Sequence, residues 1–349
     1  MKRFAFFILV MGLPCLTRAL QQSVVADQLE TSTSRQFFES ILRDDTLAMK
    51  LESDFKPLQK NKGTKDYQPA ILYFTDNTGK KTSLEIEIRP RGKMRRRLCD
   101  IPPLKIRLPG KGEDPRTLKM VTFCKDSPKY EQYLLREYFA YKLYNMLTDV
   151  SFRVQLVKMY FKDTNGEDAP SESFAILIEN EKDLVKRVNG FTLPDGAAEP
   201  DNLRTQEVEI FCLFQYMIGN TDWFPITSHN LKILGLDGKN YPVLVPYDFD
   251  YSGLVNAPYA TSDKRLELVD VTNRYYQGMK RETSETLQTF GLFLSKKADV
   301  MGFCEKFPYF DGKSRKHVVK YLREFYEIIE QPRRYKQEIL KHTDLWIKL

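Results

Sequence analysis

A strand-like alternation between residues 47 and 108 is the feature that most restricts how this chain can fold. Residues 71–74 (ILYF) form an apolar run, residues 76–79 (DNTG) are typical of a tight turn, and apolar side chains then alternate from Leu84 to Ile88. Two strands joined by a tight turn form an antiparallel hairpin, and alternation marks a strand with one buried face. The first third of the chain is therefore predicted to contain mainly antiparallel strands.

The rest of the chain predicts helices with a few strands among them. Apolar side chains recur at helical spacing over residues 130–147, and residues 205–218 form a strongly apolar run, so both segments are predicted to be helices. Further strands are predicted, and the last two of them flank a turn and form a second hairpin. They are residues 152–161, 173–179, 230–235 and 241–246.

A loop rich in proline, glycine and alanine, residues 189–200, divides these two kinds of sequence. Before it, residues 20–188 are predicted to form a β-rich lobe with one helix. After it, residues 189–349 are predicted to form a helical lobe with the second hairpin embedded in it. Strands followed by helices in this order indicate an α+β fold in two lobes.

The first 19 residues are typical of a secretory signal peptide. Lys2 and Arg3 precede an apolar stretch, and Ala19 ends a small-x-small cleavage site. A membrane span needs about 20 apolar residues, so neither this stretch nor any later one is expected to be a transmembrane anchor. A lipoprotein anchor on Cys15 is the alternative, but Gly12 stands where a lipobox has a large aliphatic residue. We expect an exported protein, periplasmic or extracellular after cleavage.

Four cysteines follow the predicted leader, an even number in a chain that is expected to be exported. Cys99 and Cys124 flank a strand-like stretch and are separated by 25 positions, which predicts a disulfide between them. Cys212 lies in an apolar helical run and is expected to be a buried thiol. Because the chain has no C-x-x-C motif and has three histidines in all, a zinc site is not expected.

The formal net charge is +7, which is mild for 349 residues and does not indicate a nucleic-acid-binding protein. The positive charge is concentrated in a basic run, residues 89–97, that includes Arg91. Clustered Lys and Arg can bind a nucleotide phosphate, a phosphorylated substrate or an anionic envelope polymer. A solvated or internally paired edge is the alternative, and the sequence leaves both open.

Most of the chemically capable residues lie between positions 219 and 253. Asp222 follows a predicted helix, Asn230 opens a strand, and Asp248 and Asp250 close the next strand, so the hairpin can bring Asn230 and Asp248 to one end. Oxygen ligands there suit Mg²⁺ or Mn²⁺. Phosphoryl transfer needs an Asp to orient the nucleophile and an Asn plus an Asp to hold the metal. The alternative is that these residues only cap helices and turns.

These residues resemble the atypical kinase-like family of the spore-coat kinase CotH and the HipA-type kinases. That pattern is an Asn-x-Asp, a later Asn, a strand pair and a Pro-aromatic-Asp element, and here residues 220–222 (NTD), Asn230 and residues 246–250 (PYDFD) occupy its places. The resemblance implies a two-lobed protein-kinase-like fold with an antiparallel-sheet N-lobe and a helix-rich C-lobe. It also implies that Asp222 is catalytic and that Asn230, Asp248 and Asp250 bind Mg²⁺ or Mn²⁺.

The upstream half resembles CotH as well, because Arg91-Gly92 precedes a lysine-bearing strand. The resemblance implies that Lys105 and Arg91 bind the nucleotide phosphates and that Glu137, on the next helix, is the acidic partner of the lysine. Glu179 lies where the adenine hinge is expected. A set of uncharacterised exported proteins is similar in the runs R-G-K-x-R-R-x-x-C-D-x-P-P-L and P-Y-D-F-D-x-S-G-L.

Two departures from the CotH and HipA pattern are visible. Asp222 and Asn230 are eight positions apart, longer than the usual four or five, so the residues between them must loop out, and a glycine-rich phosphate loop is missing.

The implied function is binding of an ATP-like nucleotide and transfer of phosphate to an extracytoplasmic acceptor. One alternative is a non-catalytic pseudokinase-type module that binds an envelope protein or polymer. The other is a metal-dependent glycosyltransferase or hydrolase that uses residues 248–250 (DFD). His229 is expected to be structural rather than a base.

Overall fold

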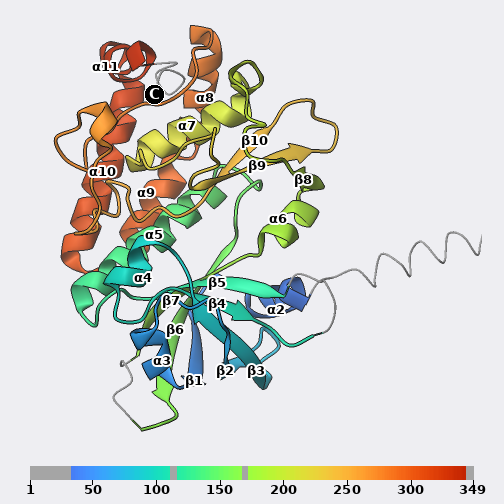
Figure 1. Cartoon of the computed structure of the whole chain (residues 1–349). Coiled ribbons are helices and arrows are strands. Elements are labelled where there is room, and N and C mark those ends of the chain that lie inside the picture. Colours follow the sequence, from blue (N-terminus) through green and yellow to red (C-terminus); the bar gives the residue numbers. More distant parts are fainter. Residues whose placement is uncertain (1–32, 111–115, 167–171, 343–349) are drawn as a thin grey trace, which may run out of the picture.

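Seven strands close into a barrel, which forms the lower part of the molecule in Figure 1. The computed structural model describes residues 33–110, 116–166 and 172–342, so the predicted signal peptide, residues 1–19, lies outside the described residues. The order of the strands around the barrel is β1-β2-β3-β4-β5-β7-β6. Their bounds are β1 Leu47–Ser53, β2 Gln68–Thr75, β3 Lys81–Pro90, β4 Leu104–Arg107, β5 Thr117–Val121, β6 Val154–Asp163 and β7 Ser173–Ile178.

Alternating burial along the strands fills the barrel with apolar side chains. In β2, Ala70, Leu72 and Phe74 are buried, while the residues between them are more exposed. Leu51 of β1 and Ile88 of β3 belong to the same core and are fully buried. Burial of a large apolar side chain stabilises a fold by about 1.5–3 kcal/mol. The interior of the barrel therefore holds its strands in register.

The closed barrel corrects the predicted fold class. A two-lobed protein-kinase-like fold with an antiparallel-sheet N-lobe is wrong, because β1 pairs antiparallel with β2 on one side and parallel with β6 on the other. This parallel pair runs from Leu47 opposite Val157 to Ser53 opposite Asp163, and it closes the sheet. Alternation along a strand shows which face is buried but not which strand lies beside it. Local patterns therefore carried no sign of the closure.

Helices and a three-stranded sheet of order β10-β9-β8 make up the upper part of Figure 1. The β9–β10 pair confirms the second predicted hairpin, and α5 and α7 confirm the two long predicted helices. The bounds of these and the remaining elements are α2 Thr33–Ile41, α3 Phe55–Lys60, α4 Met94–Leu98, α5 Pro128–Asn145, α6 Glu181–Arg187, β8 Gly190–Thr192, α7 Gln206–Ile218, β9 Leu231–Leu236, β10 Val243–Pro246, α8 Thr283–Ser295, α9 Lys297–Lys306, α10 Gly312–Glu330 and α11 Pro332–Glu338. Short 3₁₀ helices lie at Pro200–Leu203, Lys264–Leu266 and Leu340–His342.

A second core joins the outer face of the barrel to the helices. It includes Leu135 and Phe139 of α5, Phe211 and Phe214 of α7, and Phe249 just beyond the hairpin, all of them buried. The helix α5 also packs against β6 and β7 of the barrel, so it connects the barrel to the hairpin region. Among the helices of the described ranges, none is long and apolar enough to cross a membrane.

The predicted disulfide between Cys99 and Cys124 is confirmed. It ties the C-terminal end of α4 to the segment that follows β5, where the backbone N–H of Asp100 also donates to the carbonyl oxygen of Cys124 (2.8 Å). Cys212 and Cys304 are buried thiols, as expected for Cys212. The disulfide fixes α4 on the barrel, and this matters for the site because α4 carries part of the basic run.

Candidate functional site

The end of α7 sets the position of Asp222. The helix ends at Gly219, whose backbone is left-handed (φ +62°), and a Cβ there would lie 1.9 Å from the hydroxyl oxygen of Tyr321, so only glycine fits. Beyond it, the Asn220 side chain accepts a hydrogen bond from the backbone N–H of Asp222 (3.1 Å). The Trp223 indole donates to the carbonyl oxygen of Asn220 (3.1 Å). These bonds fix the turn that presents Asp222.

Asp222, His229 and Asn230 form the first group of the site, which we call the Asp222 corner. The amide nitrogen of Asn230 donates to the carbonyl oxygen of Asp222 (2.7 Å) and to its Oδ2 (2.9 Å). His229 Nε2 lies 3.0 Å from Asp222 Oδ1, and this hydrogen bond raises the pKa of His229. The residues between form a loop closed by two backbone hydrogen bonds that join Phe224 and His229. Asp222 and Asn230 are therefore in contact although they are eight positions apart in the sequence.

Asp248 reaches this region through the β9–β10 hairpin. The backbone N–H of Tyr247 donates to the carbonyl oxygen of Asn230 (3.0 Å), directly beyond the last pair of strand residues. The backbone N–H of Asp248 donates to the hydroxyl oxygen of Tyr141 on α5 (2.9 Å). Asn230 and Asp248 both have left-handed backbone (φ 54° and 66°), which is uncommon away from glycine and recurs at functional sites. Asn230 and Asp248 thus lie at one end of the hairpin, as the sequence predicts.

Arg95, Glu137 and Asp250 form a second group, which we call the Arg95 cluster. Arg95 lies on α4, and its Nε is 2.6 Å from Asp250 Oδ2 while its Nη2 is 2.5 Å from Glu137 Oε2. The same Nη2 is 3.7 Å from Asp248 Oδ1. The side chains of the cluster are 9% exposed or less, whereas the side chain of Asp248 is 42% exposed. One arginine therefore binds two buried carboxylates and reaches towards a third that is open to solvent.

Burial governs the protonation of the Arg95 cluster. It raises the pKa of Glu137 to about 8 against the opposing effect of Arg95, and it raises the pKa of Asp250 in the same way. Burial also disfavours the charge of Arg95, but Asp250 and Glu137 outweigh it and hold the arginine pKa above its usual value. Asp250 and the Tyr259 hydroxyl are hydrogen-bonded as well. Glu137 Oε1 is buried and has no hydrogen-bond partner in the described part of the chain.

The barrel contributes Lys119 of β5 to the same region. Its Nζ lies 4.6 Å from the ring centroid of Tyr247. Burial, followed by the positive charges of Arg91 and Lys232, lowers the pKa of Lys119 to about 8, while the negative charges of Glu181 and Asp248 act in the opposite direction. Lys119 has no hydrogen bond or ion pair with any residue that the structure describes. It is a half-buried cation near Asp248 that can bind an anion.

The two predicted phosphate-binding residues are placed differently. Lys105 lies opposite Lys119 across the β4–β5 pair and opposite Arg89 across the β3–β4 pair. Within residues 33–110, 116–166 and 172–342, no hydrogen bond, ion pair or ring contact joins Lys105 to the hairpin. Arg91 directly follows β3, where its backbone N–H donates to the carbonyl oxygen of Pro103 (2.8 Å), and its positive charge lowers the pKa of Lys119. Directly paired residues of neighbouring strands share a face of the sheet, so Lys105 lies beside Lys119, but the lysine with a contact to the hairpin region is Lys119, through Tyr247.

The two predicted acidic residues are engaged by arginines. Glu137 forms its ion pair with Arg95, where the resemblance implies a lysine. Glu179 has a side chain that is 1% exposed, and it pairs with Arg153 (2.8 Å) and Arg187 (2.9 Å). The Glu179 carboxylate is thus committed to these two arginines.

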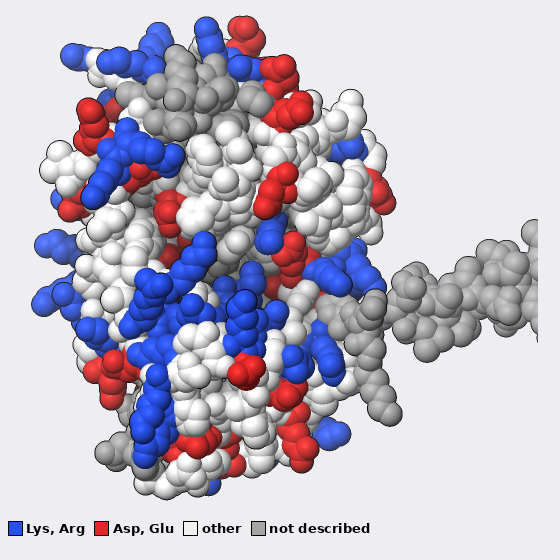
Figure 2. Space-filling model, in the orientation of Figure 1, with Lys and Arg blue, Asp and Glu red and all other residues white. Residues whose placement is uncertain are grey.

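Figure 2 shows a hollow across the middle of the face seen in Figure 1, between the barrel and the helical part. Lys and Arg side chains gather on its barrel side. The helix α4 and the strand β5, which carry Arg95 and Lys119, lie at this level of the molecule. The basic run that includes α4 also supplies Arg96 and Arg97, for which we find no ion pair among the described residues. The region is therefore suited to an anionic ligand.

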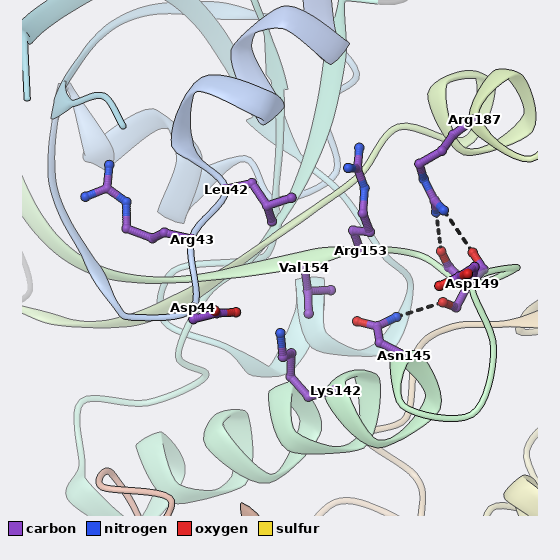
Figure 3. Close-up of a pocket in the computed structure, with 10 residues that line it drawn as sticks. Leu42, Arg43, Asp44, Lys142, Asn145, Asp149, Arg153, Val154 and Arg187 are labelled. Carbon is purple, nitrogen blue, oxygen red and sulfur yellow. Dashed lines mark hydrogen bonds between the residues drawn. The ribbon is translucent and has the colours of Figure 1, made fainter. Parts of the chain in front are cut away.

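A cavity of ≈ 440 Å³ lies elsewhere, between the start of β6 and the end of α5 (Figure 3). Its lining includes Arg153 and Arg187, the partners of Glu179. In Figure 3, Lys142 rises from α5 towards Val154, while Arg43 points away from the other residues drawn. None of the lining residues belongs to the Asp222 corner or the Arg95 cluster. Arg153 and Arg187 are already paired with Glu179, whereas Asp222, Asn230 and Asp248 meet at the hairpin, so we place the site there.

The expected Mg²⁺ or Mn²⁺ would need Asn230, Asp248 and Asp250 to converge on one ion. The hydrogen bonds from Asn230 to Asp222 use its amide nitrogen and leave the amide oxygen, which a metal would bind, but Asp250 is already bonded to Arg95. Over the described ranges, the structure holds no group of three or more His, Cys, Asp or Glu side chains that could hold a metal ion. The residues as placed do not form the expected metal site.

Sequence reasoning did not single out Lys119 or Arg95. Lys119 and Lys105 carry the same signal, since each is flanked by apolar residues within a strand, so the pattern could not choose between them. Arg95 was one of several cations in the basic run, and nothing local distinguished it. His229 was expected to be structural; it is hydrogen-bonded to Asp222, the predicted catalytic residue, and its role stays a prediction.

Comparison with known proteins gives little further information. No family model matches the chain, and no curated protein matches it. Among solved structures, the chain is similar to the Helicobacter pylori proinflammatory kinase CtkA, with a TM-score of 0.36 and 10% sequence identity, over 70% of this chain and 94% of that chain. So distant a likeness does not assign an activity, and membership of the CotH and HipA families stays a prediction. We therefore derive the function from the residues of this chain.

Proposed function

We propose that this chain binds an ATP-like nucleotide or a similar phosphate compound beside Asp248 and transfers its terminal phosphate to an acceptor. The observation that carries this proposal is the position of Lys119, a half-buried cation whose Nζ lies 4.6 Å from the ring centroid of Tyr247, the neighbour of Asp248, and which has no ion pair among the described residues. Phosphoryl transfer depends mainly on positioning the phosphates and neutralising their charge. Lys119 and Arg91 supply positive charge from the barrel, while Asp222 and Asp248 come from the hairpin region.

Asp222 is the proton acceptor in this proposal. Its side chain is 36% exposed, and its two oxygens are oriented by His229 and Asn230. The acceptor hydroxyl transfers its proton to Asp222 as its oxygen bonds to phosphorus, and the bond from phosphorus to the departing nucleoside diphosphate breaks. His229 can then share the proton, because its ring nitrogen lies 3.0 Å from the same carboxylate.

A non-catalytic binding module is the second candidate, and Arg95 favours it. Arg95 occupies the space between Asp248 and Asp250, where kinase chemistry of the expected type uses a metal. Lys119, Arg91 and the exposed cations of α4 would then bind a phosphate-bearing or acidic envelope polymer or protein without turnover. The glycosyltransferase or hydrolase alternative loses support, because Arg95 lies between Asp248 and Asp250, where that chemistry needs a metal ion.

The acceptor is proposed to lie outside the cytoplasm. The Cys99–Cys124 disulfide is compatible with that location, because disulfides persist in oxidising compartments. The signal peptide and the division at residues 189–200 stay predictions.

Thermal unfolding of the purified chain with millimolar ATP tests the proposal. A ligand that binds only the folded chain raises its melting temperature by mass action, so we expect a rise that sulfate at equal ionic strength does not reproduce. Release of ADP in the same samples separates the two candidates. A rise in melting temperature without ADP release supports the binding module. No rise with ATP, GTP or pyrophosphate contradicts the phosphotransfer proposal and leaves the module that binds a polymer or protein.

A further inference from the structure

Arg95 lies among three carboxylates. Its guanidinium atoms are 2.6 Å from Asp250, 2.5 Å from Glu137 and 3.7 Å from Asp248. Carboxylates gathered in a region of low dielectric constant repel one another unless a cation lies between them. In many phosphate-binding sites that cation is a divalent metal ion held by one or two carboxylates. In this site the chain itself supplies a cation.

We infer that Arg95 is the resident cation of this site and takes the place of a divalent metal ion between Asp248 and Asp250. The site therefore holds no Mg²⁺ or Mn²⁺ of its own. A second part follows only if the proposed function is right, namely that phosphate compounds bind here without a protein-held metal.

The chemistry of the guanidinium suits this role. Arginine stays charged in proteins, and its planar fork donates several hydrogen bonds at once, so one side chain can bind two carboxylates. Arg95 does so with separate nitrogen atoms, Nε to Asp250 and Nη2 to Glu137. If Arg95 turned out towards solvent, it would leave two buried carboxylates without a counter-charge, and this is costly. The cation is therefore held in place by the groups that it neutralises.

The backbone of Arg95 is held as well. The N–H of Cys99 donates to the carbonyl oxygen of Arg95 (2.8 Å), and Cys99 is joined to Cys124 by the disulfide. The Lys62 side chain also donates to the carbonyl oxygen of Cys99 (2.6 Å). The disulfide and the hydrogen bond from Lys62 thus anchor the C-terminal end of the short helix α4 on the barrel. Arg95 is built into the site, unlike an ion that exchanges with solvent.

A titration with Mn²⁺ alone tests the inference, with bound metal measured by electron paramagnetic resonance. The wild-type chain is expected to bind no Mn²⁺ at the site up to millimolar concentration.

Arg95→Met removes the cation and leaves Asp248, Asp250 and the unpartnered Oε1 of Glu137 around the vacated space. This variant is expected to bind one Mn²⁺ per chain at least about tenfold more tightly than wild type, because carboxylate ligands set the affinity of such sites. Arg96→Met, in the same helix, and Arg95→Lys, which keeps a charge, are expected to behave as wild type.

Two results would overturn the inference. The first is one Mn²⁺ bound by the wild-type chain and lost in Asp250→Asn. The second is an Arg95→Met variant that is folded by circular dichroism and yet binds no more Mn²⁺ than wild type. If Arg95→Met does not fold, the wild-type titration still decides, since stoichiometric Mn²⁺ there contradicts the inference and its absence supports it. No nucleotide is present, so failure of the proposed function leaves this result unchanged.

Discussion

The Asp222 corner and the Arg95 cluster each contain an aspartate, but the two side chains differ in exposure and in the charge of their partners. In the corner, Asp222 is 36% exposed, and its partners are an amide and an imidazole. In the cluster, Asp250 is 8% exposed, and its partner is a full positive charge. A carboxylate that is oriented but not neutralised can accept a proton. Separating a buried carboxylate from its arginine partner, by contrast, costs much free energy. The comparison supports the proposal that the corner carries the chemistry and that the cluster holds a structural charge.

Asp248 lies between the two groups and shares properties of both. Its side chain is 42% exposed, its backbone N–H is held by Tyr141, and its Oδ1 is 3.7 Å from Arg95. On the side of the barrel it lies near Lys119. Asp248 therefore marks the boundary where a ligand would contact the protein.

The largest expected effect comes from Arg95→Met. Removal of one partner of a buried ion pair leaves an uncompensated charge and costs about 3–5 kcal/mol, so the free energy of unfolding, measured in urea, should fall by that amount. Arg96→Met in the same helix is the control and should change it little, because we find no ion pair for Arg96 in the described ranges. Equal losses for both variants would mean that the cluster has no special structural role.

A smaller effect is expected on ligand binding from Lys119→Met. Loss of a charged hydrogen-bond donor typically costs about 1.5–3 kcal/mol, so the affinity for ATP, measured by calorimetry, should fall by about ten- to a hundredfold. Lys105→Met tests the lysine that the resemblance implies. The structure predicts a much smaller loss of ATP affinity for Lys105→Met than for Lys119→Met. A larger loss in Lys105→Met would instead support Lys105 as the phosphate-binding lysine.

The pKa of Lys119 predicts a pH dependence of binding. Because its pKa in the folded chain is about 8, the charged form is lost as the pH rises through that value, and the affinity for ATP should fall with it. The stability of the unliganded chain should change in the other direction. Between pH 8 and about 10.5 the unfolded chain holds this proton more tightly, so the contribution of Lys119 to stability rises with pH. Calorimetry at pH 7 and pH 9 should show the first effect in wild type and not in Lys119→Met.

Local signals in the sequence predict the local parts of this structure. The β9–β10 hairpin follows from two strand-like runs around a turn, and it is enough to place Asn230 and Asp248 at one end. The disulfide follows from an even count of cysteines and the spacing of one pair. In each case the residues that meet are close along the chain or belong to one small motif.

The parts that could not be predicted depend on contacts between distant segments. The barrel closes through a parallel pair that joins Leu47 to Val157, and strand alternation does not identify such a neighbour. Arg95 meets Glu137 and Asp250 from positions 42 and 155 residues away, so nothing near Arg95 distinguishes it from the other cations of its run. Tertiary packing decides which charges are buried together, and burial then decides which of them are neutralised.

The most direct test of the account is Asp222→Asn, measured for both stability and turnover. Asparagine is nearly isosteric and the site is open, so the free energy of unfolding should change by less than about 1 kcal/mol. Release of ADP from ATP should fall by about a hundredfold or more, because general-base catalysis contributes roughly 10²–10⁴-fold. ADP release at the wild-type rate, or a loss of several kcal/mol in stability, would contradict the division between a chemical corner and a structural cluster.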